Sequence, residues 1–235
     1  MIILVILILA FDFFISYSNA SYCGRYWSES KATGGSFRAY VVCGYVMAIA
    51  GFTMVYGYIV IMLLPYVLPL FPKFAETDMT ALIELSSDLL YVMIAVAVIP
   101  TGFIIWFRSV ANAWKQRSFG SIVTAGWNTY AQVHNTVSAC REMPSALKRI
   151  SKSLFGGKKK KGSEYLGALA ILVIIIALLG GYFTASAIMK KADAEYDELP
   201  QNDNSYWKQK RLIELIQLTF FYFYWLVPSY AITRF

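Results

Sequence analysis

Residues 108–162 have the sequence RSVANAWKQRSFGSIVTAGWNTYAQVHNTVSACREMPSALKRISKSLFGGKKKKG. This stretch lies between two apolar parts of the chain and contains eleven Lys and Arg residues but one acid, Glu142. It ends in four consecutive lysines, Lys158, Lys159, Lys160 and Lys161. Lysine and arginine beside apolar segments of bilayer length favour the cytoplasmic side of a membrane. The stretch therefore predicts the side of the membrane on which each of the remaining segments begins and ends.

The composition excludes an ordinary soluble domain. The chain is 58% hydrophobic, 17% aromatic and 15% charged, with a mean hydropathy of +0.53. These values are typical of an integral membrane protein. The net charge of +7 would suggest nucleic acid in a soluble chain. Here the basic residues lie beside apolar segments, so we expect membrane lipids as partners and no nucleic acid.

Five apolar segments approach the length of helix that crosses a bilayer, about 20 residues. Pro65 is expected to end the helix of the second segment, and Pro100 to kink that of the third. We therefore predict an all-α integral membrane protein with five transmembrane helices. The segments are 2–17, 39–64, 89–107, 165–189 and 212–232.

The basic stretch divides the chain into three parts. Residues 1–107 contain helices 1–3 with short loops, 108–164 form a basic cytoplasmic helical region, and 165–235 contain helices 4 and 5 with an extracytoplasmic connector. The N-terminus then lies outside and the C-terminus inside, which leaves most of the 21 Lys and Arg residues in the cytoplasm. We expect a bacterial or archaeal plasma (inner) membrane, because the sequence shows no organelle signal.

The first apolar segment contains one acid, Asp12. Ser18-Asn19-Ala20 resembles a signal-peptide cleavage site, but no basic residue precedes the segment, so we interpret it as a retained helix. Asp12 then lies near mid-bilayer, where a carboxylate costs at least about 2.5 kcal/mol. Two interpretations stay open for it: a hydrogen bond to a neighbouring helix, or a place on an ion or proton path.

Small residues recur at helical spacing in two of the segments. Such a stripe lets helices approach closely, either within the chain or between subunits. The stripe residues are Gly44, Ala48 and Gly51 in the second segment, and Gly180 and Gly181 in the fourth.

The basic stretch itself is predicted to be helical. Its first part has an apolar face that needs burial, either within the chain or against a partner, and we assign partner docking to Trp127, Tyr130, Val133 and Val137. From Pro144 onwards a short basic amphipathic helix leads into the lysine run. It suits anionic lipid or a partner, although the lysines are also explained by topology alone. The binding candidates are Lys148, Arg149, Lys152, Lys158, Lys159, Lys160 and Lys161.

No catalytic or metal-binding motif is evident. The one histidine, His134, and the three cysteines lack metal-ligand spacing, so we expect no metal and no cofactor. A lipid-directed enzyme would have to use the cluster of Cys23, Arg25, Trp27 and Glu29 in the loop 18–38. We therefore expect a protein that is not an enzyme.

These features favour a polytopic membrane subunit or scaffold of a larger assembly, which docks a partner through its basic cytoplasmic helices. Other protein subunits, identical or different, are the expected partners. The alternative is a homo-oligomeric ion-conducting pore gated through the cytoplasmic region. Its selectivity elements would be Asp12 or the acids at the outer helix ends, Glu84, Asp88 and Glu214.

Overall fold

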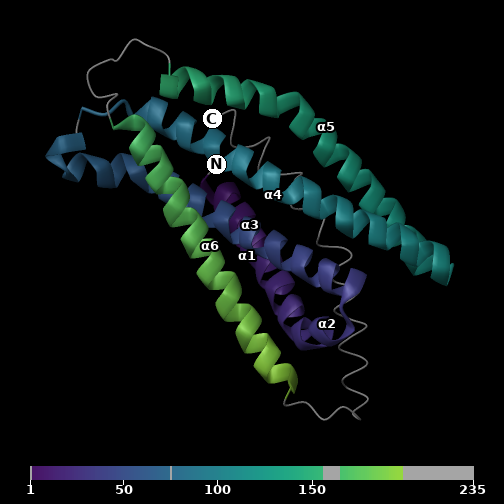
Figure 1. The fold of residues 1–235 in the computed structure, drawn as a ribbon. Coiled ribbons are helices and arrows are strands. Elements are labelled where there is room, and N and C mark those ends of the chain that lie inside the picture. The colour runs from purple at the N-terminus through teal and green to yellow at the C-terminus, as the bar shows by residue number, and fades with distance from the viewer. Residues whose placement is uncertain (1, 75, 156–164, 198–235) are drawn as a thin grey trace.

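The computed structural model describes residues 2–74, 76–155 and 165–197, and the described residues fold into helices without a strand (Figure 1). Two short 3-10 turns, Leu68–Leu70 and Pro72–Phe74, follow the third helix. The α-helices are α1 (Ile2–Arg25), α2 (Trp27–Thr33), α3 (Gly35–Val67), α4 (Met79–Gln116), α5 (Phe119–Phe155) and α6 (Leu166–Asp197).

Four of these helices, α1, α3, α4 and α6, are long and apolar enough to cross a membrane, by length and composition. The prediction of a helical, multi-pass membrane protein is therefore confirmed at this level. The apolar stretches within them are Val5–Arg25, Gly35–Leu70, Met79–Gln116 and Leu166–Glu195. The fifth predicted segment, 212–232, and the lysine run lie outside the described residues.

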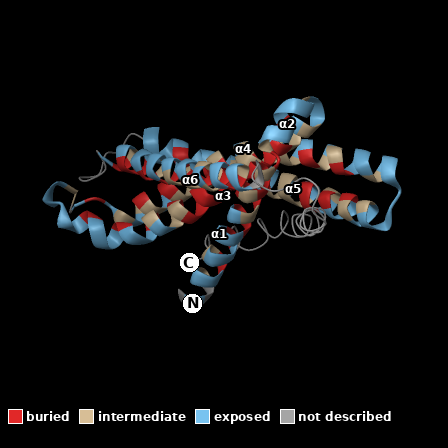
Figure 2. Ribbon diagram, turned by 90° about the horizontal axis from the view of Figure 1, so that it is seen from below, coloured by how far each residue is buried: buried red, intermediate tan, exposed pale blue. Residues whose placement is uncertain are grey.

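Helix α3 lies at the centre of the bundle and packs against α1, α4 and α6. The ring of Phe52 on α3 meets that of Phe13 on α1 edge to face, at 5.1 Å between centroids. On another side, the Tyr56 hydroxyl is 2.9 Å from the Thr184 hydroxyl of α6. Buried residues follow the inner sides of the helices, and exposed residues cover the outside (Figure 2).

The two ends of α4 decide where the neighbouring chain goes. Asp78 caps the first turn, because its carboxylate accepts a hydrogen bond from the Ala81 amide at 3.1 Å. Pro100 lies inside the helix without ending it. Arg117 then adopts a left-handed conformation with φ 48°, which terminates α4 and reverses the chain. Helix α5 consequently returns antiparallel along α4 (Figure 1).

The course of α5 differs from the one that the charge argument predicts. The charge argument placed Asp88 outside and Arg149 in the cytoplasm, yet the two form an ion pair. It likewise separated Phe74 from Tyr165, whose rings lie 5.4 Å apart. Residues 108–155 therefore do not form a region beyond one end of the bundle, because α5 runs beside α4 from one end of that helix to the other.

Candidate functional site

Polar side chains of α5 face α4. The Gln132 amide donates a hydrogen bond to the Ile99 carbonyl at 3.2 Å, and the Trp106 indole donates one to the Thr129 hydroxyl at 2.8 Å. Gly102 allows this close approach, because a Cβ added there would lie 2.3 Å from Gln132 Oε1. Small residues and interhelical hydrogen bonds of this kind hold membrane helices together.

The opposite face of α5 is apolar and exposed, the reverse of a helix on a soluble protein. Residues 119–140 of α5 contain no charged side chain, and these 22 helical residues extend about 33 Å, the length that the hydrocarbon core requires. The outward apolar residues are Phe119, Ile122, Val123, Tyr130, Val133 and Val137, and the buried ones are Ala125, Ala131 and Ala139.

A groove runs between α4 and α5 on this outer side. It encloses about 200 Å³, and its walls are almost entirely apolar. Phe103 and Trp106 form the α4 side, and Val133 and Val137 form the α5 side. The groove has the shape and polarity to receive an apolar side chain or an acyl chain.

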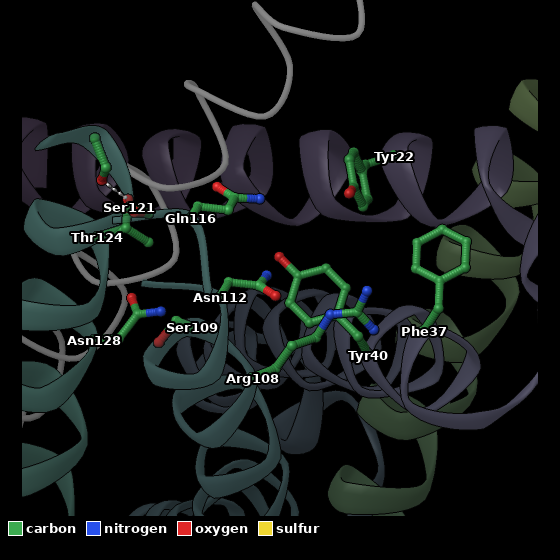
Figure 3. Close-up of a pocket in the computed structure, with 11 residues that line it drawn as sticks. Tyr22, Phe37, Tyr40, Arg108, Ser109, Asn112, Gln116, Ser121, Thr124 and Asn128 are labelled. Atoms are coloured by element: carbon green, nitrogen blue, oxygen red, sulfur yellow. Dashed lines mark hydrogen bonds between the residues drawn. The ribbon is translucent and has the colours of Figure 1, made fainter. Parts of the chain in front are cut away.

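A second, polar cavity of about 270 Å³ lies where α4 ends and α5 begins (Figure 3). Tyr22 of α1 and Tyr40 of α3 form its aromatic wall. Helix α4 contributes Arg108, Ser109, Asn112 and Gln116, and α5 contributes Gly120, Ser121, Thr124 and Asn128. Phe37 completes the lining.

Arg108 is held at this cavity by groups of α3. Its guanidinium donates a hydrogen bond to the Ser36 carbonyl and lies 5.1 Å from the Phe37 ring and 4.9 Å from the Tyr40 ring. Figure 3 shows the guanidinium beside the Tyr40 ring, among the other side chains that line the cavity. The aromatic faces orient the cation without neutralising it.

Asp12 is 2% exposed and lies inside the bundle on α1. Its backbone carbonyl accepts a hydrogen bond from Ser16 at 2.7 Å, while its carboxylate Oδ2 has no hydrogen-bond partner among the described residues. Asp12 does not line the cavities of about 10, 200 and 270 Å³. Its burial on α1 is what a place in the helix packing requires, and its role on an ion path stays a prediction.

The stripes of small residues face neighbouring helices of the same chain. A Cβ on Gly181 would lie 2.3 Å from Thr53 Oγ1 and 2.9 Å from the Ile49 carbonyl oxygen of α3. Gly180 faces the Tyr56 ring, and Ala48 and Gly51 are buried. Gly44 faces Cys23, with 2.8 Å from an added Cβ to the sulfur.

The basic residues of α5 that were candidates for lipid or partner binding differ in their contacts. Lys148 and Lys152 are exposed, whereas Arg149 binds Asp88. Arg149 lies beyond the uncharged stretch, and its hydrogen bond to the Asp88 carboxylate raises the pKa of Arg149. Lys158, Lys159, Lys160 and Lys161 lie outside the described residues.

The cluster proposed for a lipid-directed enzyme is not assembled. Cys23 is buried against α3, while Glu29 is exposed on α2. No group of three or more His, Cys, Asp or Glu side chains comes together to hold a metal within the described part of the chain.

Sequence reasoning missed the polar cavity, although a signal for it exists. Arg108, Asn112 and Gln116 recur every four residues and therefore share one face of α4. Comparison with protein-family models, curated proteins and solved structures finds no match to this chain. Its class, a helical multi-pass membrane protein, therefore follows from its own helices.

Proposed function

We propose that the chain is a non-enzymatic, multi-pass subunit of a larger membrane assembly, and that it docks a partner subunit through the outer face of α5. In this proposal α5 crosses the membrane beside α1, α3, α4 and α6. The observation that carries it is the reversed polarity of α5, whose Asn128 and Gln132 face inward while Val133 and Val137 face outward. Such a helix suits apolar surroundings better than water, because the amides of Asn128 and Gln132 are buried and large apolar side chains are exposed.

The docking surface consists of Trp127, Tyr130, Val133 and Val137, next to the groove between α4 and α5. We assign it to a transmembrane helix of the partner rather than to lipid. Tyr130 stacks on His134 at 6.0 Å, midway along the uncharged stretch. Polar-tipped aromatic side chains favour membrane interfaces over the bilayer centre. A partner helix that carries a polar group could form a hydrogen bond with Tyr130 or His134 at this depth, whereas an acyl chain could not.

In this arrangement, the distribution of Lys and Arg no longer predicts which end of the bundle faces the cytoplasm. The N-out prediction relied on residues 108–164 lying together on one side. With α5 crossing, Arg117 and Arg141 lie at opposite ends of the bundle, so charge no longer distinguishes the two sides. Labelling from the two sides of sealed vesicles would determine the orientation.

A photo-reactive amino acid at Val137 tests the docking surface in the native membrane. Phe183 is the matched control, because it is also exposed and apolar but lies on α6. After gentle extraction, we expect Val137 to cross-link to a different membrane protein and Phe183 to cross-link to none. Lipid adducts alone at both positions would refute docking.

The same cross-linking experiment distinguishes the mixed assembly from the alternative function, a homo-oligomeric pore. A covalent pair of two copies of this chain at Val137 would contradict the mixed assembly and favour the homo-oligomeric pore. Ion flux through the reconstituted oligomer would then be measured. Flux in the wild type that Asp12→Asn removes would establish the pore.

A further inference from the structure

The polar cavity between α4 and α5 carries one unneutralised positive charge. Arg108 is the only ionisable side chain of basic or acidic type among the described residues that line it. A guanidinium has five N–H donors, and one of them is directed to the Ser36 carbonyl. The remaining donors are available to an anion, and guanidinium groups match the geometry of phosphate and carboxylate oxygens.

Asn128 lies at the inner end of the cavity and also lines a space of about 10 Å³ between α4 and α5. It is 3% exposed, and its Oδ1 is covered by protein atoms. The polar groups that a ligand in the cavity can reach are therefore those of Arg108, Asn112 and Gln116.

The rest of the lining favours a polar, singly charged group. Asn112 and Gln116 present two more side-chain amides along the same face as Arg108, and each amide can both donate and accept. No carboxylate opposes them in the lining. A volume of about 270 Å³ holds a group of several polar atoms rather than a single ion.

The position of the cavity points to lipid. Tyr22 lies near the end of the apolar part of α1, Tyr40 near the start of α3, and Gln116 at the end of α4. Tyrosines and arginines at the ends of membrane helices lie at the level of lipid headgroups. The cavity therefore opens at the depth where a headgroup, and not an acyl chain, is found.

We propose that this cavity binds the headgroup of a singly charged phospholipid of the phosphatidylglycerol type. Arg108 binds the phosphate, and the side-chain amides of Asn112 and Gln116 accept hydrogen bonds from headgroup hydroxyls. The site is independent of the docking surface, which lies on the outer side of α5. A soluble phosphate ester has the same chemistry, so the experiment separates the two sources.

The test uses the full chain, purified from vesicles that contain phosphatidylglycerol and phosphatidylcholine in equal amounts. Native mass spectrometry counts the lipids that the protein retains. We expect the wild type to retain phosphatidylglycerol about tenfold over phosphatidylcholine, and Arg108→Gln to lose this preference. Lys115→Gln removes the same charge from the same helix outside the cavity lining, and should keep it.

A second variant guards against misfolding, because Arg108 also joins α4 to α3. Asn112 is exposed and lines the cavity, so Asn112→Leu should lower phosphatidylglycerol retention several-fold with an unchanged unfolding temperature. Equal retention of both lipids by the wild type would overturn the proposal, as would equal losses in Arg108→Gln and Lys115→Gln.

Glycerol 3-phosphate, added to protein in neutral detergent, tests whether the cavity binds a soluble phosphate ester. We expect it to leave the unfolding temperature unchanged at concentrations where phosphatidylglycerol raises it. If the soluble ester stabilises the wild type but not Arg108→Gln, and the lipid has no effect, the site binds a soluble phosphate ester and the lipid assignment is wrong.

Discussion

Arg149 and Asp88 form a two-pronged ion pair, with the guanidinium Nε 2.8 Å and Nη2 2.6 Å from the two carboxylate oxygens. Sixty-one positions separate them in the chain, one near the end of α5 and the other near the start of α4. This contact joins the end of α5 to the start of α4 in the antiparallel pair. The end of α5 also lies next to the start of α6, where a Cβ on Gly167 would lie 2.9 Å from Leu154.

Reversing the two charges of this pair tests the register. Asp88→Arg or Arg149→Asp alone should lower the free energy of unfolding by about 1 kcal/mol, a small value because Arg149 is largely solvated. The double variant should recover most of the loss. Thermal unfolding in detergent measures all three. Additive losses in the double variant would show that the two side chains do not meet.

The crossing of α5 is tested by labelling from the two sides of sealed vesicles. Ser118 and Ser153 are exposed near the two ends of α5, and each is changed to cysteine in a chain whose three native cysteines are replaced. An impermeant maleimide should reach Ser118→Cys from one side and Ser153→Cys from the other. Labelling of both from the same side would contradict the crossing, and the reactive side of each gives the orientation.

Gly181 should tolerate no side chain. An added Cβ would collide with the Thr53 amide nitrogen at 2.7 Å and the Ile49 carbonyl oxygen at 2.9 Å, so α3 and α6 would have to separate. We expect Gly181→Ala to lower the free energy of unfolding by about 1–3 kcal/mol. Gly126→Ala is the control, because open space surrounds Gly126 in α5. It should raise stability by about 0.5–1 kcal/mol, and equal effects at both sites would contradict the α3–α6 packing.

Asp12 should be replaceable by asparagine without loss of the fold. Its carboxylate is buried with Oδ2 unpaired among the described residues, and an amide of the same shape avoids the cost of a buried charge. We expect Asp12→Asn to unfold at the same or a higher temperature, with a gain of up to about 2.5 kcal/mol. A marked loss of stability would show that the carboxylate has a partner of its own in the membrane.

The sequence indicates the apolar helices well but does not indicate that α5 runs back along α4. The hydrophobic lengths of α1, α3, α4 and α6 suffice to predict helices that cross a membrane. The small residues around Gly51 and Gly181 also indicate close packing, though not which helices meet. Asn112 and Asn128 are ordinary polar residues in sequence, and only the return of α5 brings them to one cavity.

What the sequence alone determined is the class of protein, because hydrophobic length and composition do not depend on how the helices are arranged. Only the tertiary structure decided the course of α5. Hydropathy adds up residue types without regard to direction, so Asn128 and Gln132 make the helix look too polar for a membrane. Because both are buried while large apolar residues such as Val133 and Val137 face outward, the same composition can suit a bilayer. The direction of each side chain depends on the neighbouring helix.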